Sequence, residues 1–384
     1  MKWLYGTLAL LAIILVGFWL FAETPKDIAI DPNHPWQHKA AEAVEETQKD
    51  EAKADPRKVD DVILQKDYCA AGQYFTGGRN QKHVAHFLDL MLEGEAGKTI
   101  PPDDKLILQA LLSKDFDYSV KKLKEAKSWQ GKMILGMVLS GTVFHPHPFR
   151  GRQATQEELQ EALLALDQAE DMNWDNGFIP LYRYLVMKKK DGDGPGLKQF
   201  LKDELSRRKN MENPFGASLV SFARLRAQDP MFYSLSLWQE RILSGSVVDA
   251  TDELEHAAMS DPELARSTLR LADTWQRKSL PMVNEGYGHP FVPFLDPEIS
   301  TALGAELWPK VYPNQPIPDR YRDPPEHISR RMRDRNPSET DEFGWLTGYG
   351  KECGPKWKEA VDNDYALLRD RLQKWDELQR ATKR

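Results

Sequence analysis

The sequence predicts a mainly α-helical protein, in which a helical-repeat (α–α solenoid) domain follows an N-terminal transmembrane helix and precedes a proline-rich irregular segment. Three observations predict this fold class. Residues 3–22 form an uninterrupted apolar run, apolar side chains recur at helical spacing over 61–280, and prolines are concentrated in 309–337. No alternating run of β-branched residues is long enough to predict a sheet.

The composition excludes several classes of protein. With 384 residues, of which 41% are hydrophobic, the chain has enough apolar side chain to bury a core of ordinary size. The net charge of −7 lacks the basic excess of a nucleic-acid-binding surface, so no nucleic-acid partner is expected. Two cysteines exclude a disulfide-rich scaffold and a multi-cysteine zinc or iron–sulfur module. We expect no cofactor.

The first element, residues 1–22, is a predicted transmembrane signal anchor. Its 20 uncharged residues, 3–22, would span about 30 Å as a helix, which is the thickness of the hydrocarbon core of a bilayer. A cleaved signal peptide has a shorter apolar region and a small-x-small exit, whereas this run ends in Leu20-Phe21-Ala22. Lys2 precedes the run, so we expect a single-pass protein of the inner (plasma) membrane with its N-terminus in the cytoplasm. The C-terminal domain would then be periplasmic or extracellular.

Residues 23–60 are the predicted tether between the anchor and the folded domain. They are rich in Ala, Glu, Lys and Asp, and almost no large apolar side chain follows Trp36. A solvated helix and a disordered spacer both fit this composition. The folded domain is therefore expected to begin near residue 61.

The helical-repeat domain, 61–280, is predicted from successive amphipathic stripes. The first helix covers 80–93 and stops at Gly94, and Pro101-Pro102 opens the next one. Thr155 and Glu158 have the spacing of a capping box, and Ser260-Asp261-Pro262 interrupts the helical pattern of 253–276. The stripes between these points are Leu106, Ile107, Ala110 and Leu111; Val120, Leu123 and Ala126; Met133, Ile134, Met137 and Val138; and Leu159, Ala162, Leu163, Leu166 and Ala169.

One of these stripes carries a family resemblance. Ala162, Leu166 and Ala169 alternate small, large and small side chains, and the turn Asn173-Trp174-Asp175-Asn176-Gly177 follows them. This pattern resembles the second helix of a tetratricopeptide repeat and its closing turn, with the best agreement over 155–205. Small residues let antiparallel helices approach closely, while the large one fills the groove between them. The resemblance implies paired helices that present a surface to a peptide or to a partner protein.

The chain also departs from the family pattern. Trp174 stands where the family has proline, and the matching alanines Ala126 and Ala169 are 43 residues apart instead of 34. The additional length falls in the loop 144–152. We therefore expect divergent repeat-like helical hairpins and not a regular tetratricopeptide domain.

The predicted segment 281–355 is extended, rich in proline, arginine and aromatic residues, and packed on the helical domain. Seven of the 25 prolines fall in 309–337, a density through which a helix cannot propagate. Arginine and aromatic side chains are enriched at protein interfaces, but such a segment can equally serve as a packing strap. A final amphipathic helix is expected over 356–384. The candidate partner-binding residues are Trp308, Tyr312, Tyr321, Arg320 and Arg322.

The remaining candidates concern metal and disulfide chemistry. Two close histidine pairs could supply four ligands to one metal ion, although no recognised metal motif accompanies them and no metal site is predicted. Cys69 and Cys353 could bridge the two ends of a periplasmic domain. No catalytic residue is predicted, because neither cysteine has a catalytic context and no nucleophile-elbow motif is present. The histidine pairs are His83 with His86, and His145 with His147.

Together these patterns predict a membrane-anchored scaffold or accessory subunit that binds another protein of a cell-envelope assembly. The alternative is an envelope enzyme that acts on a glycan or peptide polymer, with a site between the helical domain and residues 281–350. A third interpretation is a sensor of a small ligand or a metal. The chain is more readily explained as a binding protein than as an enzyme.

Overall fold

The structure is a computed structural model, and it describes four stretches of the chain. Leu372 is the one buried residue among five isolated helical positions near the C-terminus. The described residues are 89–142 without 91 and 114, 152–228, 236–284, 295–322, and the single residues 369, 372, 373, 377 and 380.

Several predictions of the sequence analysis fall outside these residues. They include the anchor, 1–22, and the tether, 23–60. The histidines and cysteines considered for metal and disulfide chemistry are outside as well, so their convergence stays an untested prediction. These residues are His83, His86, His145, His147, Cys69 and Cys353.

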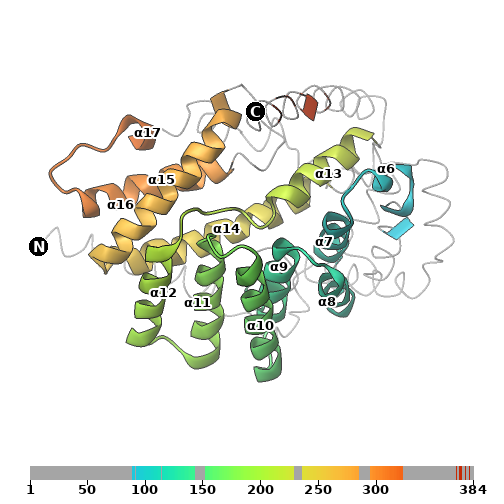
Figure 1. The fold of residues 1–384 in the computed structure, drawn as a ribbon, viewed down its shortest axis with the longest axis horizontal. Helices are drawn as coiled ribbons and strands as arrows, with labels where there is room; N and C mark the ends of the chain where they lie inside the picture. Colours follow the sequence, from blue (N-terminus) through green and yellow to red (C-terminus); the bar gives the residue numbers. More distant parts are fainter. Residues whose placement is uncertain are drawn as a thin grey trace, which may run out of the picture. The chain divides into compact units, whose positions relative to one another are not determined.

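The described stretches are helical, which confirms the mainly α fold class (Figure 1). Within them, the pairing of Asn176 with Asn210 is an isolated β-bridge and no strand is present. Nor does any helix in these stretches have the length and hydrophobicity to cross a membrane. The helices are α6 (Glu95–Lys98), α7 (Pro102–Leu112), α8 (Phe116–Glu125), α9 (Trp129–Ser140), α10 (Gln156–Met172), α11 (Phe178–Asp191), α12 (Pro195–Arg207), α13 (Gly216–Gln228), α14 (Ser236–Met259), α15 (Pro262–Asn284), α16 (Leu295–Val311) and α17 (Asp319–Arg322).

The helix boundaries follow local chemistry. Proline opens α7, as predicted, because its missing N–H is not needed in the first turn. At the start of α10, Thr155 Oγ1 accepts from the backbone N–H of Glu158, and the Glu158 carboxylate accepts from the N–H of Thr155. This is the predicted capping box. Helix α9 ends at Gly141, whose φ of 63° is the left-handed conformation that glycine adopts without strain.

Consecutive helices pack on one another from α7 to α12, and Figure 1 shows α10, α11 and α12 side by side. The later helices then contact the earlier ones: α13 packs on α7, α14 on α11, and α15 on α12. Each helix of the first series therefore has a neighbour in sequence, and three of them also have a distant one. This arrangement buries most residues of the predicted apolar stripes, while Leu106, Val120 and Leu163 are partly exposed.

Helices α9 and α10 approach each other closely. A Cβ added at Gly136 would lie 2.8 Å from Leu166 Cγ and 3.0 Å from the carbonyl oxygen of Ala162. Ala162, Leu166 and Ala169 are all fully buried. The small-large-small stripe thus serves the close packing for which its residue types are suited.

The structure differs from the sequence analysis over 295–311. Helix α16 occupies this range, although the proline content predicts an extended chain there. The reason is the placement of the prolines: Pro297 lies in the first turn, Pro309 lies in the last, and no proline stands between them. The irregular chain begins only after Val311, at residues 312–318.

Candidate functional site

The structure brings the predicted aromatic and arginine residues of the C-terminal segment together. The ring of Trp308, on α16, lies 4.5 Å from that of Tyr312 and 6.0 Å from that of Tyr321, measured between centroids. The guanidinium of Arg320 lies 4.8 Å from the Tyr321 ring. Arg322 bonds the carbonyl of Ile317 within the same segment. These residues form one cluster, which we call the strap cluster.

Much of the strap cluster is used for internal packing. Tyr321 is 1% exposed, its ring occupies the space that a side chain at Gly304 would need, and burial raises the pKa of its hydroxyl to about 12. Asp273 of α15 accepts from the Tyr321 hydroxyl at 3.1 Å and pairs with Arg320 at 2.8 Å. Gln276 donates to the carbonyl of Arg320 at 2.8 Å. Residues 312–322 are therefore fastened to α15 and α16.

Only part of the strap cluster is accessible to a partner. Tyr312 is 37% exposed, and the side chains of Arg320 and Arg322 are 38% and 51% exposed. Tyr321 is buried and Trp308 is partly buried against the core, so both serve mainly to hold the strap in place. The interpretation of this segment as a packing strap thus accounts for more of these contacts than its interpretation as a protein interface does.

A second surface lies at the turn between α10 and α11, which the sequence analysis did not select. Trp174 is 52% exposed and Met172 is 50% exposed, so the turn presents two large apolar side chains to solvent. The ammonium group of Lys209 lies 4.8 Å from the centroid of the Trp174 ring, in a cation–π contact. Lys209 also lies 3.6 Å from the carboxylate of Asp175. We call Met172, Trp174 and Lys209 the tryptophan turn.

The backbone of the turn between α10 and α11, which carries Trp174, is hydrogen-bonded to the segment that follows α12. The N–H of Gly177 donates to the carbonyl of Asn210 at 2.8 Å, and the N–H of Asn210 donates to the carbonyl of Asp175 at 3.2 Å. The side chain of Asn176 is fully buried; its Nδ2 donates to the Glu212 carbonyl, and its Oδ1 accepts from the Glu212 N–H, both at 3.0 Å. Two turns that are far apart in sequence therefore hold each other in place.

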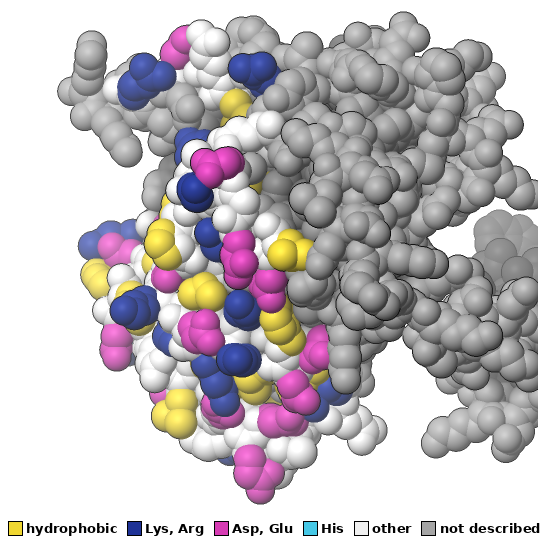
Figure 2. Space-filling view, turned by 90° about the vertical axis from the view of Figure 1, so that its right-hand side faces the viewer, with side chains coloured by type: hydrophobic (Ala, Val, Ile, Leu, Met, Phe, Trp, Pro, Cys, Tyr) yellow, Lys and Arg dark blue, Asp and Glu magenta, His cyan; other side chains and the backbone are white. Residues whose placement is uncertain are grey.

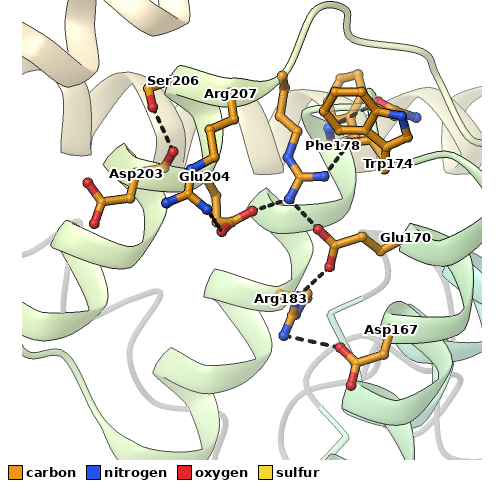
Figure 3. A network of polar contacts seen from close by, with 11 residues as sticks. Asp167, Glu170, Trp174, Phe178, Arg183, Asp203, Glu204, Ser206 and Arg207 are labelled. Carbon is orange, nitrogen blue, oxygen red and sulfur yellow. Dashed lines mark hydrogen bonds and ion pairs between the residues drawn. The ribbon is translucent and has the colours of Figure 1, made fainter.

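An ionic network centred on buried Arg208 supports the turn (Figure 3). Arg208 is 4% exposed and forms ion pairs with Glu170 of α10 and Glu204 of α12. Its guanidinium also donates to the carbonyl oxygen of Trp174. Arg183 of α11 pairs with the other oxygen of Glu170, so one carboxylate joins two guanidinium groups. The network links three helices to the turn that carries the exposed indole.

This arrangement is suited to binding a protein. Tryptophan, tyrosine and arginine dominate the binding energy of protein interfaces, and a side chain that is already held in position loses less entropy on binding. Figure 2 shows Lys and Arg side chains interspersed with Asp and Glu over the described part of the face that it draws. That face thus has no large area of one charge that would favour nucleic acid.

Metal binding was considered in the sequence analysis for two histidine pairs. His83, His86, His145 and His147 are not among the residues that the structure describes, so the approach of the two pairs stays an untested prediction. Among the described residues, no group of three or more His, Cys, Asp or Glu side chains is placed to hold a metal ion. The candidate site is therefore built from the two surfaces above.

Comparison with protein-family models, with curated proteins and with solved structures found no match. The site is therefore assigned from its geometry and chemistry. Of the two surfaces, the tryptophan turn exposes more apolar side chain on a hydrogen-bonded support.

Proposed function

We propose that this chain is a membrane-anchored helical-repeat protein that binds another protein of a cell-envelope assembly, as a scaffold or accessory subunit. The observation that carries the proposal is Trp174, an exposed indole whose backbone is bonded to buried Arg208 and paired with a second turn. A large aromatic side chain in this setting is typical of the centre of an interface. The strap cluster, with exposed Tyr312 and Arg322, is a second contact surface, built on the end of α16 and the chain that follows it.

The helical hairpins support a binding role. Helices α9 and α10 pack through Gly136, Ala162 and Leu166, and this tight pairing is what the resemblance to tetratricopeptide repeats implies. Divergent arrays of this kind bury their core between neighbouring hairpins and leave their loops and outer faces for partners. The tryptophan turn is one of these loops. Fold resemblance informs function only through such a site, and here the site is the exposed tryptophan.

The proposed cellular location of the helical domain is inferred from the sequence of residues 1–22. An uncleaved anchor with Lys2 on the cytoplasmic side would place the helical domain in the periplasm or outside the cell. Membrane fractionation tests this point: the full chain should sediment with membranes at its full mass of 44.0 kDa, and a chain without residues 1–22 should not. If the full-length sequence is expressed and the protein is recovered from the soluble fraction without residues 1–22, the prediction of an uncleaved anchor is contradicted.

Affinity purification from solubilised membranes tests the binding role. The full chain should recover a partner in constant stoichiometry, and Trp174→Ala should reduce its recovery by at least about tenfold, as expected when a hot-spot side chain worth about 1.4 kcal/mol or more is removed. Leu164→Ala is the matched control, because it removes a large apolar side chain that is 53% exposed on α10 and belongs to neither surface. Equal recovery with both variants and the unaltered chain would contradict the assignment to the tryptophan turn.

A further inference from the structure

An open pocket of about 260 Å³ lies between α11 and α14, next to the end of α9. Its apolar lining includes Leu185 and Ala250, and Thr142 contributes from the chain that follows α9. Pockets for drug-sized ligands occupy about 300–1,000 Å³ and combine an apolar lining with a few polar groups. This pocket has that composition and a smaller volume, which favours a small ligand.

Lys189 of α11 lines the pocket with an amine that neutral oxygen atoms hold in place. Its Nζ donates to the carbonyl of Ser140, the last residue of α9, at 2.5 Å and to the carbonyl of Arg152 at 3.0 Å. The lysines on either side of it, Lys188 and Lys190, pair with carboxylates at 2.7 Å and 3.7 Å. Within the described part of the chain, Lys189 has no carboxylate at ion-pair distance.

The two lysines of the pocket are therefore held in different ways. The other charged residues of its lining are Lys188, Asp249 and Glu253. Glu253 of α14 accepts a hydrogen bond from Lys188, and this contact raises the pKa of Lys188. Lys188 is thus kept as an ammonium ion by a carboxylate, whereas Lys189 contacts uncharged carbonyl groups and lies near the guanidinium of Arg152.

These surroundings favour the neutral amine of Lys189. An ammonium group has three N–H donors, so Lys189 can lose one proton, keep both of its hydrogen bonds, and retain a lone pair that no protein group uses. Burial and the nearby Arg152 guanidinium both lower the pKa of Lys189, because each disfavours the ammonium form. Free amine is therefore present at a lower pH than for an ordinary surface lysine. A lysine activated in this way is a nucleophile towards carbonyl compounds.

We propose that Lys189 captures a small aldehyde in this pocket as an imine. The nitrogen lone pair attacks the carbonyl carbon, and in the overall step the C=O bond of the aldehyde is replaced by a C=N bond. The carbonyl oxygen leaves as water with two of the three protons of the ammonium form, and the third proton stays as the N–H of the protonated imine. Nothing is oxidised or reduced. The remaining N–H can keep the bond to the Ser140 carbonyl, while the Arg152 carbonyl, whose contact with Lys189 is exposed, can accept from water.

The shape of the pocket favours an aldehyde with a short alkyl chain. Leu185 and Ala250 supply apolar surface for such a chain, and burial of apolar surface stabilises the bound form. A ketone would need room for two substituents beside a nitrogen that two carbonyl groups already approach. The carbon that reacts should therefore carry one substituent and one hydrogen.

Reductive trapping in the full chain, solubilised in detergent, tests the proposal. The probe is propanal with cyanoborohydride, which reduces an imine to a secondary amine that peptide mass spectrometry locates. Lys189 should be modified at least about tenfold faster than Lys198, an exposed lysine of α12 outside the pocket, because the pocket holds the aldehyde beside the amine. The rate at Lys189 should also level off as the propanal concentration rises, whereas the rate at Lys198 should rise in proportion. Modification of Lys189 no faster than that of Lys198, or a rate that does not level off, would overturn the proposal.

A variant that fills the pocket separates capture from a purely structural role of Lys189. Leu185→Trp should reduce trapping at Lys189 to the rate of Lys198, because the larger side chain occupies the space of the aldehyde. Leu164→Trp is the matched control, since it changes an exposed side chain of α10 outside the pocket, and trapping should stay as in the unaltered chain. The melting temperature of each variant reports whether it is folded. If Lys189 serves only to hold the end of α9, folded Leu185→Trp would be trapped as fast as Leu164→Trp, and this result would also overturn the proposal.

Discussion

Helix α10 makes two interfaces of opposite chemistry. Towards α9 it presents Ala162 and Leu166, which are fully buried against Gly136. Towards α12 it presents Glu170, which pairs with the buried guanidinium of Arg208. An apolar interface loses free energy in proportion to the contacts that a substitution removes, whereas an ionic interface leaves an uncompensated charge when one partner is removed. The second interface should therefore be the more sensitive to a single change.

The largest expected effect comes from Arg208. Arg208→Met should lower the free energy of unfolding by about 3 kcal/mol, because Glu204 would lose its buried cation and Glu170 would keep only Arg183. Denaturant titration of the full chain in detergent measures this value. The control is Arg266→Met, since Arg266 is exposed on α15 outside the network, and a surface change of this kind should stay within about 0.5 kcal/mol. Similar losses for the two variants would show that the network does not support the fold.

The apolar interface is tested at its closest point. Gly136→Ala should lower the free energy of unfolding by about 1–3 kcal/mol, because the new methyl group would force Leu166 or the α10 backbone to move. Gly196→Ala is the matched control in α12, where an added Cβ meets nothing within 4 Å. That change should instead stabilise the protein by about 0.4–1 kcal/mol, since it reduces the freedom of the unfolded chain. The same denaturant titration decides the sign of each effect.

A smaller loss of stability is expected when the N-terminal cap of α10 is removed, because the cap belongs to neither of its two interfaces. Thr155→Ala should cost about 1 kcal/mol, because the first turn loses the hydroxyl that accepts from the Glu158 N–H. Hydrogen exchange should show faster exchange at the start of α10 and unchanged protection in α9. If α9 and α10 lose protection equally, the cap of α10 and the α9–α10 interface unfold together, which would contradict a purely local effect of Thr155→Ala.

The smallest expected effect is a pH dependence at the same cap. A hydrogen bond from Arg152 and the backbone N–H of Thr155 hold the pKa of Glu158 below its ordinary value of 4.5. A carboxylate with a lowered pKa in the folded state stabilises the protein above its unfolded pKa and loses this contribution as the pH falls through the folded pKa. Glu158→Gln should therefore cost about 0.5 kcal/mol at about pH 7 and less towards about pH 3, as expected for a partly exposed ion pair. A cost that does not change with pH would contradict this origin.

The sequence predicted the apolar interface and missed the ionic one, for a physical reason. Alternating small and large residues at helical spacing indicate close packing without knowledge of the partner helix, so Ala162 and Leu166 could be selected directly. A carboxylate such as Glu170 looks the same on a solvated face as in a buried pair, because its environment depends on Arg208, 38 residues away in the chain. The exposure of Trp174 likewise depends on a turn that is distant in sequence. Helix α16 was missed because prolines were counted by density and not by position.

Part of the candidate site was likewise predicted from the sequence, and part of it could be found only from the structure. The five residues of the strap cluster were found from their composition, because aromatic and arginine side chains in a proline-rich segment are unusual. Their division into packing and exposed residues required the contacts of Asp273 and Gly304. The tryptophan turn was missed because its support comes from a segment 36 positions along the chain, where Asn176 bonds Glu212, and no local pattern brings these residues together.

Site-specific photocrosslinking in intact membranes tests the central claim, that the tryptophan turn is a surface for a protein partner, most directly. A photoreactive phenylalanine at position 174 should yield a discrete crosslinked species, while the same group at Gln160, an exposed position near the start of α10, should not. Lys209→Glu should leave the chain folded and lower the yield at position 174, because it places a carboxylate beside the ring. No species at position 174 beyond that seen at Gln160 would contradict the account.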